Sequence, residues 1–308
     1  MKFHLKDSAV LIAKGFCMGA ADVVPGVSGG TMAFILGIYT RLIDAIKSFD
    51  VAWVGALLKF DFRTFFARPH FAFLIPLGLG LVSAVIFFTR IVPIPSLLKT
   101  HPEHIYSLFF GLVLGSILVL FDEIGWNSVT DGLHMLLGIV IGGVVVSAVP
   151  TQTPDTWWFI MASGAIAICA MVLPGISGSF ILLILGKYAF VLDGIGNLKL
   201  AIIVPFALGA AFGLAAFTRL LSWLLHRFER PMLLIISGFL VTSLWVIWPF
   251  QQRQYISVRG KQQLLESSPI APPWETITIE ASFLALLGLV IVIGASRLAN
   301  RSTTRRIR

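Results

Sequence analysis

The sequence predicts an all-α, polytopic membrane protein with an inverted-topology repeat, in which each half consists of a broken, re-entrant helical hairpin and three transmembrane helices. Composition is the first observation: apolar residues make up 57% of the 308 residues and charged residues only 12%, against about a quarter charged residues in a soluble domain. The second is a set of apolar stretches that reach the roughly 20 residues needed to cross a bilayer as a helix. The third is a Gly- and Pro-containing loop motif that occurs once in each half.

Taken in order, the apolar stretches define each predicted element. Broken hairpins, in which two short apolar runs flank a Gly- and Pro-containing break, are predicted at 8–46 and 157–195. The spans predicted for the first half are 71–92, 105–121 and 133–149. The spans predicted for the second half are 201–225, 232–250 and 279–296. These runs do not alternate polar and apolar residues, which argues against a membrane β-barrel.

Lys and Arg residues are distributed unevenly over the predicted loops. Each broken hairpin returns to the side that it entered, so the number of crossings does not depend on its depth. With both termini in the cytoplasm, the outside loops contain only Lys99, Lys187, Lys199, Arg253, Arg259 and Lys261. The positive-inside rule therefore favours cytoplasmic N- and C-termini. We interpret the net charge of +8 as topology and attraction to anionic lipid, and expect no nucleic-acid partner.

Two connecting segments are long enough to have structure of their own. Residues 41–70 mix charged residues with Phe and Trp, which is typical of helices lying in the inner membrane interface. Residues 251–273 are polar and end in a Pro pair, and we expect an outer loop with partial order. Within the spans, glycine pairs predict close helix packing, as at Gly111/Gly115, Gly138/Gly142 and Gly209/Gly213.

The chain contains an internal repeat. Residues 25–30 (PGVSGG) match residues 174–179 (PGISGS), and the match continues in register from ILGIY after the first motif to ILGKY after the second. A second block agrees as well, because Pro76, Gly80 and FTR ending at Arg90 match Pro205, Gly209 and FTR ending at Arg219. The sequence is therefore interpreted as a duplication with halves at 1–150 and 151–308.

An odd number of crossings in each half places the two copies in opposite orientations. Such inverted repeats are typical of transporters, in which the substrate binds near the membrane midplane between the repeats. The two broken hairpins are then predicted to approach each other from opposite faces of the membrane. Alternating access of the substrate site to the two sides of the membrane follows when the inward-facing geometry of one half becomes the outward-facing geometry of the other.

The two motifs are the candidate binding site. Non-helical backbone at membrane depth must be buried in protein or line a wet cavity, and the helix that follows each break starts with free N–H groups that favour an anion. Ser28 is predicted to cap the first of these helices. A single copy would be interpreted as a tight turn, but two inverted copies favour a site. The candidate substrate-binding residues are Gly26, Ser28, Gly29, Gly30, Thr31, Gly175, Ser177, Gly178 and Ser179.

Three charged residues in apolar surroundings extend this site. Arginine near a helix centre costs roughly 2.5–3.5 kcal/mol, so Arg90 and Arg219 are candidates for pairing with phosphate oxygens; the structural alternative is that they snorkel to an interface. Asp22 is the acid of the first break and corresponds to Met171 in the second. It either hydrogen-bonds the broken backbone or carries a coupling proton or cation. Scattered histidines and two cysteines give no metal spacing, and no catalytic residue, metal or cofactor is predicted.

Residues 19–31 (GAADVVPGVSGGT), with the second copy at 173–178, resemble the bacterial polyprenyl-phosphate transporter family, long filed as a domain of unknown function. The resemblance covers nearly the whole chain. It implies flipping of undecaprenyl phosphate from the outer to the inner leaflet of the bacterial inner membrane, which recycles the carrier lipid for peptidoglycan and other envelope polymers. The expected partners are this anionic lipid, the bilayer and a coupling proton or cation. Because Met171, Ser179 and Phe180 replace Asp22, Gly30 and Thr31, the two sites need not be equivalent.

Two other functions remain open on the sequence. Polyprenyl-diphosphate phosphatases also have inverted repeats, broken hairpins and a Pro-Gly-x-Ser loop, but in that family an Arg follows the Ser and a Glu pair activates the chemistry. Here Gly29 and Gly178 follow the serines, and no Glu pair lies near the first hairpin. A transporter of small soluble anions would use the same residues without a lateral opening to lipid. A structural scaffold is disfavoured by the repeated hairpins.

Overall fold

The computed structural model describes residues 5–24, 27–92, 94–148, 151, 153–258 and 261–306. Pro25 and Gly26 of the first motif therefore lie outside the described residues. The chain divides into two compact units. Unit 1 comprises Met1–Val92 and Ser147–Leu233, and unit 2 comprises Pro93–Val146 and Leu234–Arg308. Each unit takes segments from both predicted halves, and the division at residue 150 stays a prediction.

Unit 1 contains both broken hairpins. The helices of the first hairpin are α1 (Leu5–Asp22), α2 (Gly29–Ile35) and α3 (Tyr39–Lys47). After the short α4 (Val51–Leu58) and α5 (Phe62–Ala67), a long helix α6 (Phe71–Ile86) ends in a π-helical turn, η1 (Phe87–Ile91). The helices from the second part of the chain are α10 (Trp157–Val172), α11 (Gly178–Ile184), α12 (Tyr188–Gly196) and α13 (Leu200–Arg227). The helix α14 (Glu229–Val246) begins in this unit and continues in unit 2.

Unit 2 contains the remaining helices and a β-hairpin. Its helices are α7 (Ile94–Thr100), α8 (Pro102–Ile124), α9 (Val129–Val146), most of α14 and α15 (Thr276–Arg306). The strands β1 (Gln251–Val258) and β2 (Lys261–Pro269) are antiparallel, with Gln251 opposite Pro269. The polar segment after α14 therefore contains a hairpin where the sequence predicted a partly ordered loop. Within this unit α15 packs along α8, and Gly138 of α9 lies against the backbone of Ile235 in α14.

Six helices in the described part of the chain are long and apolar enough to cross a membrane. They are Phe71–Ile91, Pro102–Ile124, Val129–Val146, Leu200–Arg227, Glu229–Val246 and Thr276–Gly294. Each coincides with one of the six predicted spans to within a few residues, which confirms the all-α, polytopic class. The helices α11 and α12 form a bent pair at 110°. Because α11 has seven residues and is about 10 Å long, it cannot cross a bilayer of about 30 Å alone.

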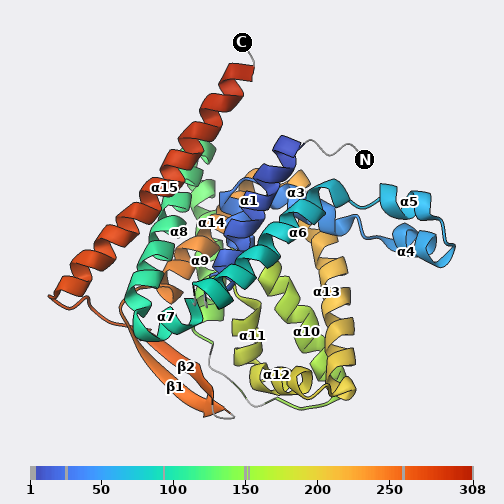
Figure 1. Cartoon of the computed structure of the whole chain (residues 1–308). Helices are drawn as coiled ribbons and strands as arrows, with labels where there is room; N and C mark the ends of the chain where they lie inside the picture. Colours follow the sequence, from blue (N-terminus) through green and yellow to red (C-terminus); the bar gives the residue numbers. More distant parts are fainter. Residues whose placement is uncertain are drawn as a thin grey trace. The chain divides into compact units, whose positions relative to one another are not determined.

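The two hairpins enter unit 1 from opposite ends. In Figure 1, α1 descends from the end where α3 lies, whereas α10 starts from the end where α12 lies, and the two meet in the middle of the unit. The long helices follow the same rule: α6 starts beside α3, and α13 starts beside α12, so they run in opposite directions past the hairpins. This is the arrangement that an inverted repeat requires.

Close contact of α1 with α6 and of α10 with α13 depends on glycine. A Cβ added to Gly80 of α6 would overlap the backbone oxygen of Ile12 in α1, and one added to Gly209 of α13 would overlap that of Met161 in α10. Gly80 and Gly209 are matched residues of the second repeat block. The predicted close packing is therefore confirmed at Gly209. Gly80 makes the same kind of contact in the other hairpin, so both hairpins pack closely against their long helix through a glycine.

We expect Gly80→Ala to destabilise the protein, because the new methyl group would push α1 and α6 apart. Overpacking of this kind costs about 1–3 kcal/mol, which would appear as a lower melting temperature and a lower yield of folded protein in detergent. Gly78→Ala is the matched control on the same helix, since a Cβ there would meet no atom within 4 Å. Equal melting temperatures of the two variants would contradict this account of the α1–α6 contact.

The α4–α5 segment is closed by an ion pair. The guanidinium of Arg68 donates to both carboxylate oxygens of Asp50, with the shortest distance 2.6 Å. The hydrogen bonds from Arg68 and from the Trp53 amide hold the pKa of Asp50 at about 2, so this pair stays ionised at neutral pH. Exposed apolar side chains, among them Val51, Leu58 and Phe60, fit the predicted location in the membrane interface.

Candidate functional site

The tip of the first hairpin is capped from within. Ser28 is the N-cap of α2, and its Oγ accepts the N–H of Gly30 at 3.1 Å, which confirms the predicted cap. The carboxylate of Asp22, at the end of α1, accepts the N–H of Gly29 at 2.6 Å. Both bonds satisfy amide groups that a helix start leaves without an internal partner. Asp22 therefore has the backbone-bonding role that the sequence left open beside ion coupling.

The tips of the two hairpins are bonded to each other. The hydroxyl of Thr31, whose residue is only 1% exposed, accepts the N–H of Gly175 at 2.9 Å. In the other direction, Ser28 Oγ donates to the carbonyl of Met171 at 3.3 Å, and the Tyr39 hydroxyl donates to the carbonyl of Val172 at 3.1 Å. These bonds satisfy broken backbone that lipid cannot hydrogen-bond. The predicted meeting of the two motifs is thus observed within unit 1.

The tip of the second hairpin is more open. Ser177 precedes α11 but makes no capping hydrogen bond with its side chain. Its Oγ lies 2.8 Å from the Oγ of Ser179, and Ser179 is exposed. At the position of Asp22 this hairpin has Met171, which accepts nothing through its side chain and is 48% exposed. The hydroxyl groups of Ser177 and Ser179 therefore lie beside the point where the tips meet. The second hairpin has no carboxylate at the position that corresponds to Asp22.

The two predicted arginines lie away from the tips. Arg90 is exposed on the π-helical turn η1 at the end of α6, and π-helical turns are frequent at functional sites. Arg219 lies near the end of α13, where its Nη1 donates to the carbonyl of Ala215 at 2.5 Å, and it is close enough to Asp50 to act on that carboxylate. In Figure 1, α6 and α13 run in opposite directions. Since Arg90 follows the end of α6 and Arg219 lies in the last third of α13, the two arginines belong to opposite ends of unit 1.

The structure thus brings together part of the predicted site. Ser28, Gly30 and Thr31 lie at the tip contact with Gly175, and Ser177 with Ser179 forms the open hydroxyl pair. Gly29 and Gly178 are buried at the starts of α2 and α11, where a Cβ on Gly178 would press on the backbone oxygen of Ala167. Gly26 lies outside the described residues. Among the described contacts, none joins Arg90 or Arg219 to either tip.

Sequence reasoning missed a polar network at the end of unit 1 where α3 and α13 meet. Ser222 Oγ donates to Asp44 Oδ1 at 2.8 Å and accepts from Lys47 Nζ at 3.0 Å, and His226 Nε2 lies 3.6 Å from Asp44 Oδ2. The repeat signal could not reveal this network, because the residues that contact each other are not repeat equivalents of one another. In the described part of the chain, no three His, Cys, Asp or Glu side chains are arranged to hold a metal ion.

Two relatives of this chain are transporters by name. A relative from Vibrio cholerae serotype O1, named polyprenyl-phosphate transporter, is 37% identical over 285 residues, which cover 92% of this chain and 92% of the relative. A second, from Staphylococcus aureus and with the same name, is 32% identical over 260 residues, covering 77% of this chain and 85% of the relative. No solved structure matches the chain.

A family model described as undecaprenyl phosphate translocase-like matches residues 18–265. This range includes the first hairpin from the end of α1 onward, the whole second hairpin and five of the six long apolar helices. This range and the similarity to the two relatives agree with the family resemblance that residues 19–31 and 173–178 indicated. The chain is a multi-pass membrane protein and belongs to the undecaprenyl phosphate translocase-like family.

Proposed function

We propose that this protein flips undecaprenyl phosphate, or a closely related polyprenyl phosphate, from the outer to the inner leaflet of the bacterial inner membrane, with both termini in the cytoplasm. The returned carrier lipid then serves the synthesis of peptidoglycan and other envelope polymers. The observation that carries the proposal is the pair of broken hairpins bonded tip to tip, with the hydroxyl groups of Ser177 and Ser179, which are hydrogen-bonded to each other, beside the contact.

The problem that such a protein solves is electrostatic. A phosphate monoester has a charge of about −1.5 to −2 at neutral pH, and burying an unpaired charge in hydrocarbon is prohibitive. The polyprenyl tail needs no such help, because it is as apolar as the lipid around it. The protein therefore has to shelter the headgroup alone, while the tail stays in the bilayer.

The second hairpin is the better candidate for holding the headgroup. In the first hairpin, Asp22 and Ser28 already occupy the amides of Gly29 and Gly30, and a carboxylate at this point repels phosphate. Ser177 and Ser179 present hydroxyl donors without a nearby acid of that kind. The other motif residues then position the two tips. They are Gly175 and Gly178 in the second hairpin and Gly29, Gly30 and Thr31 in the first. This assigns unequal roles to the two copies of the motif.

Arg90 and Arg219 have a different role in this mechanism. Since they lie toward opposite ends of unit 1, they are proposed to attract and neutralise the headgroup as it enters from one leaflet and leaves into the other. A guanidinium pairs with two phosphate oxygens at once, which suits this task. Movement of one predicted half against the other would then transfer access between the two membrane faces.

The test uses the purified full-length protein in proteoliposomes containing a polyprenyl phosphate. A phosphatase added outside reports how fast headgroups from the inner leaflet reach the outer one, and we expect this rate to exceed that of protein-free vesicles. Release of inorganic phosphate without added phosphatase would instead show a lipid phosphatase. Uptake of inorganic phosphate into the vesicles, with no lipid flipping, would show a transporter of soluble anions. Either result would overturn the proposal.

Asp22→Asn separates capping from ion coupling. The amide oxygen of asparagine can still accept the Gly29 N–H, so we expect the melting temperature and the flipping rate to stay close to those of the wild type. Asp22→Ala removes the acceptor and should cost about 1 kcal/mol of folding stability, measured by thermal unfolding in detergent. If Asp22→Asn is stable but its flipping no longer responds to an imposed pH gradient, Asp22 carries the coupling proton and the capping role is not its only one.

A further inference from the structure

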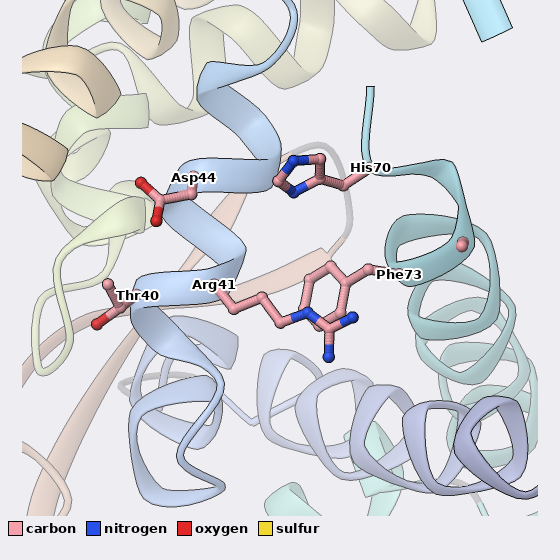
Figure 2. A pocket seen from close by; sticks show the side chains of 6 residues that line it. Thr40, Arg41, Asp44, His70 and Phe73 are labelled. Atoms are coloured by element: carbon pink, nitrogen blue, oxygen red, sulfur yellow. The ribbon is translucent and has the colours of Figure 1, made fainter. Parts of the chain in front are cut away.

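A cavity of about 580 Å³ lies in unit 1 between α3 and the start of α6. We call it the Arg41 pocket, and its lining residues are Thr40, Arg41, Asp44, His70, Ala72 and Phe73. Figure 2 shows Arg41 crossing the space from α3 to Phe73, with His70 directed toward α3 from the other side. The pocket lies at the end of the unit where the first hairpin enters, and its residues are not those of the hairpin tips.

Arg41 forms no ion pair with an acid among the described residues. Its guanidinium carbon lies 4.5 Å from the centre of the Phe73 ring, a cation–π contact that fixes its position. The acid among the lining residues, Asp44, points away from Arg41 in Figure 2. Its two oxygens face Ser222 and His226 of α13 instead. A cation is therefore held in place while the neighbouring carboxylate is directed elsewhere.

Neighbouring cations differ from Arg41 in this respect. Arg68 is paired with Asp50, and Lys47 donates to Ser222. Lys14 of α1 donates to the carbonyl of Leu36 and lies near enough to Arg41 for the two cations to repel each other. This repulsion between two cations favours an anionic ligand beside Arg41, which would relieve it.

The outer face of α6 connects the pocket to lipid. Ala72, a lining residue, is followed on the same helix face by Ile75, Leu79, Val82 and Ile86, spaced alternately by three and four residues. All four of these apolar side chains are exposed. A ligand with an anionic group in the pocket can therefore keep a long apolar chain against α6 and in the bilayer.

We infer that the Arg41 pocket binds the phosphate group of a lipid phosphate monoester, with Arg41 as the pairing cation and His70 as a second donor. The inference rests on the proposed function and adds a second headgroup site, distinct from Ser177 and Ser179. With the predicted orientation, this site lies at the cytoplasmic end and receives the headgroup after it has passed the hairpin tips. Inorganic phosphate shares the same chemistry, so the test has to separate the two sources.

The test follows the reaction of phenylglyoxal with individual arginines of the full-length protein in nanodiscs, read by peptide mass spectrometry. Farnesyl phosphate is the lipid probe and inorganic phosphate the soluble one. We expect farnesyl phosphate to slow modification of Arg41 at least fivefold and to leave Arg63 unchanged, an exposed arginine of α5 outside the pocket. An unchanged rate at Arg41 would overturn the inference, and equal protection by the same concentration of inorganic phosphate would overturn its assignment to lipid.

Arg41→Ala tests the same point by affinity and transport. We expect at least a tenfold weaker binding of farnesyl phosphate and slower flipping, with partial recovery in Arg41→Lys and no effect of the matched control Arg63→Ala. If Arg41→Ala flips polyprenyl phosphate at the wild-type rate and Arg41 is not protected, the pocket inference fails while the proposed function stands. Absence of flipping by the wild type would refute the proposed function itself.

Discussion

Replacing Ser177 and Ser179 together by alanine should slow the flipping of polyprenyl phosphate by about a hundredfold. A hydrogen bond to a charged group contributes about 1.5–3 kcal/mol, and each 1.4 kcal/mol corresponds to a factor of ten. The two hydroxyls lie 2.8 Å apart and Ser177 caps no amide, so their loss should leave the fold intact. The melting temperature of the double variant in detergent should therefore stay close to that of the wild type.

Ser28→Ala is the matched control in the other hairpin. Ser28 caps α2 and donates to the carbonyl of Met171, so its hydroxyl is used by the protein itself. We expect this variant to lose about 1 kcal/mol of stability, as for other N-cap serines, with a smaller effect on the flipping rate. The opposite pattern, in which Ser28→Ala flips slowly at an unchanged melting temperature while the double variant flips normally, would place the headgroup at the first hairpin.

Alanine at Arg90 or at Arg219 should each slow flipping by about tenfold or more, because each guanidinium is proposed to neutralise the phosphate at one end of unit 1. Lysine at either position should restore part of the rate, since it keeps the charge but not the two-pronged geometry. Arg227→Ala is the control on α13, two turns beyond Arg219 and exposed, and should flip normally. Rates are measured in the same phosphatase assay.

The two arginines should also differ in sidedness. Because they lie toward opposite ends of the unit, loss of one should mainly impair flipping that starts from one leaflet, and loss of the other should impair flipping in the opposite direction. Proteoliposomes with a uniform protein orientation allow both directions to be measured. If both variants keep the wild-type rate in both directions, the arginines only snorkel to the interfaces, and the neutralising role is wrong.

Much of this fold could be predicted because its causes are local. A helix that crosses a bilayer needs a continuous apolar stretch of fixed length, and the spans at 71–92 and 201–225 reappear as Phe71–Ile91 and Leu200–Arg227. The breaks follow from Gly and Pro, which end a helix wherever they cluster. The cap at Ser28 follows from its place directly before α2. These features depend on near neighbours in the chain.

The inequality of the two hairpins could be predicted only in part. The sequence shows Asp22 replaced by Met171, but it does not show that the Asp22 carboxylate lies on the Gly29 amide. The bond from Gly175 to Thr31 joins residues 144 apart in the chain, and such pairs are set by how the two hairpins pack. The repeat favours equivalent sites, and the packing makes one tip closed and the other open.

The sequence by itself determined the membrane class, the six long apolar helices, the two breaks and the residues that could meet an anion. Tertiary structure decided which of these residues meet, because that depends on the directions of α6 and α13 and on the turn of each hairpin. It separated Arg90 from Arg219, directed Asp44 toward α13, and placed the guanidinium of Arg41 in α3 over the ring of Phe73 in α6. Hydrophobic periodicity determines the structure of neighbouring residues in the chain. The position of a charge relative to an acid that is distant in the sequence depends on how whole helices pack.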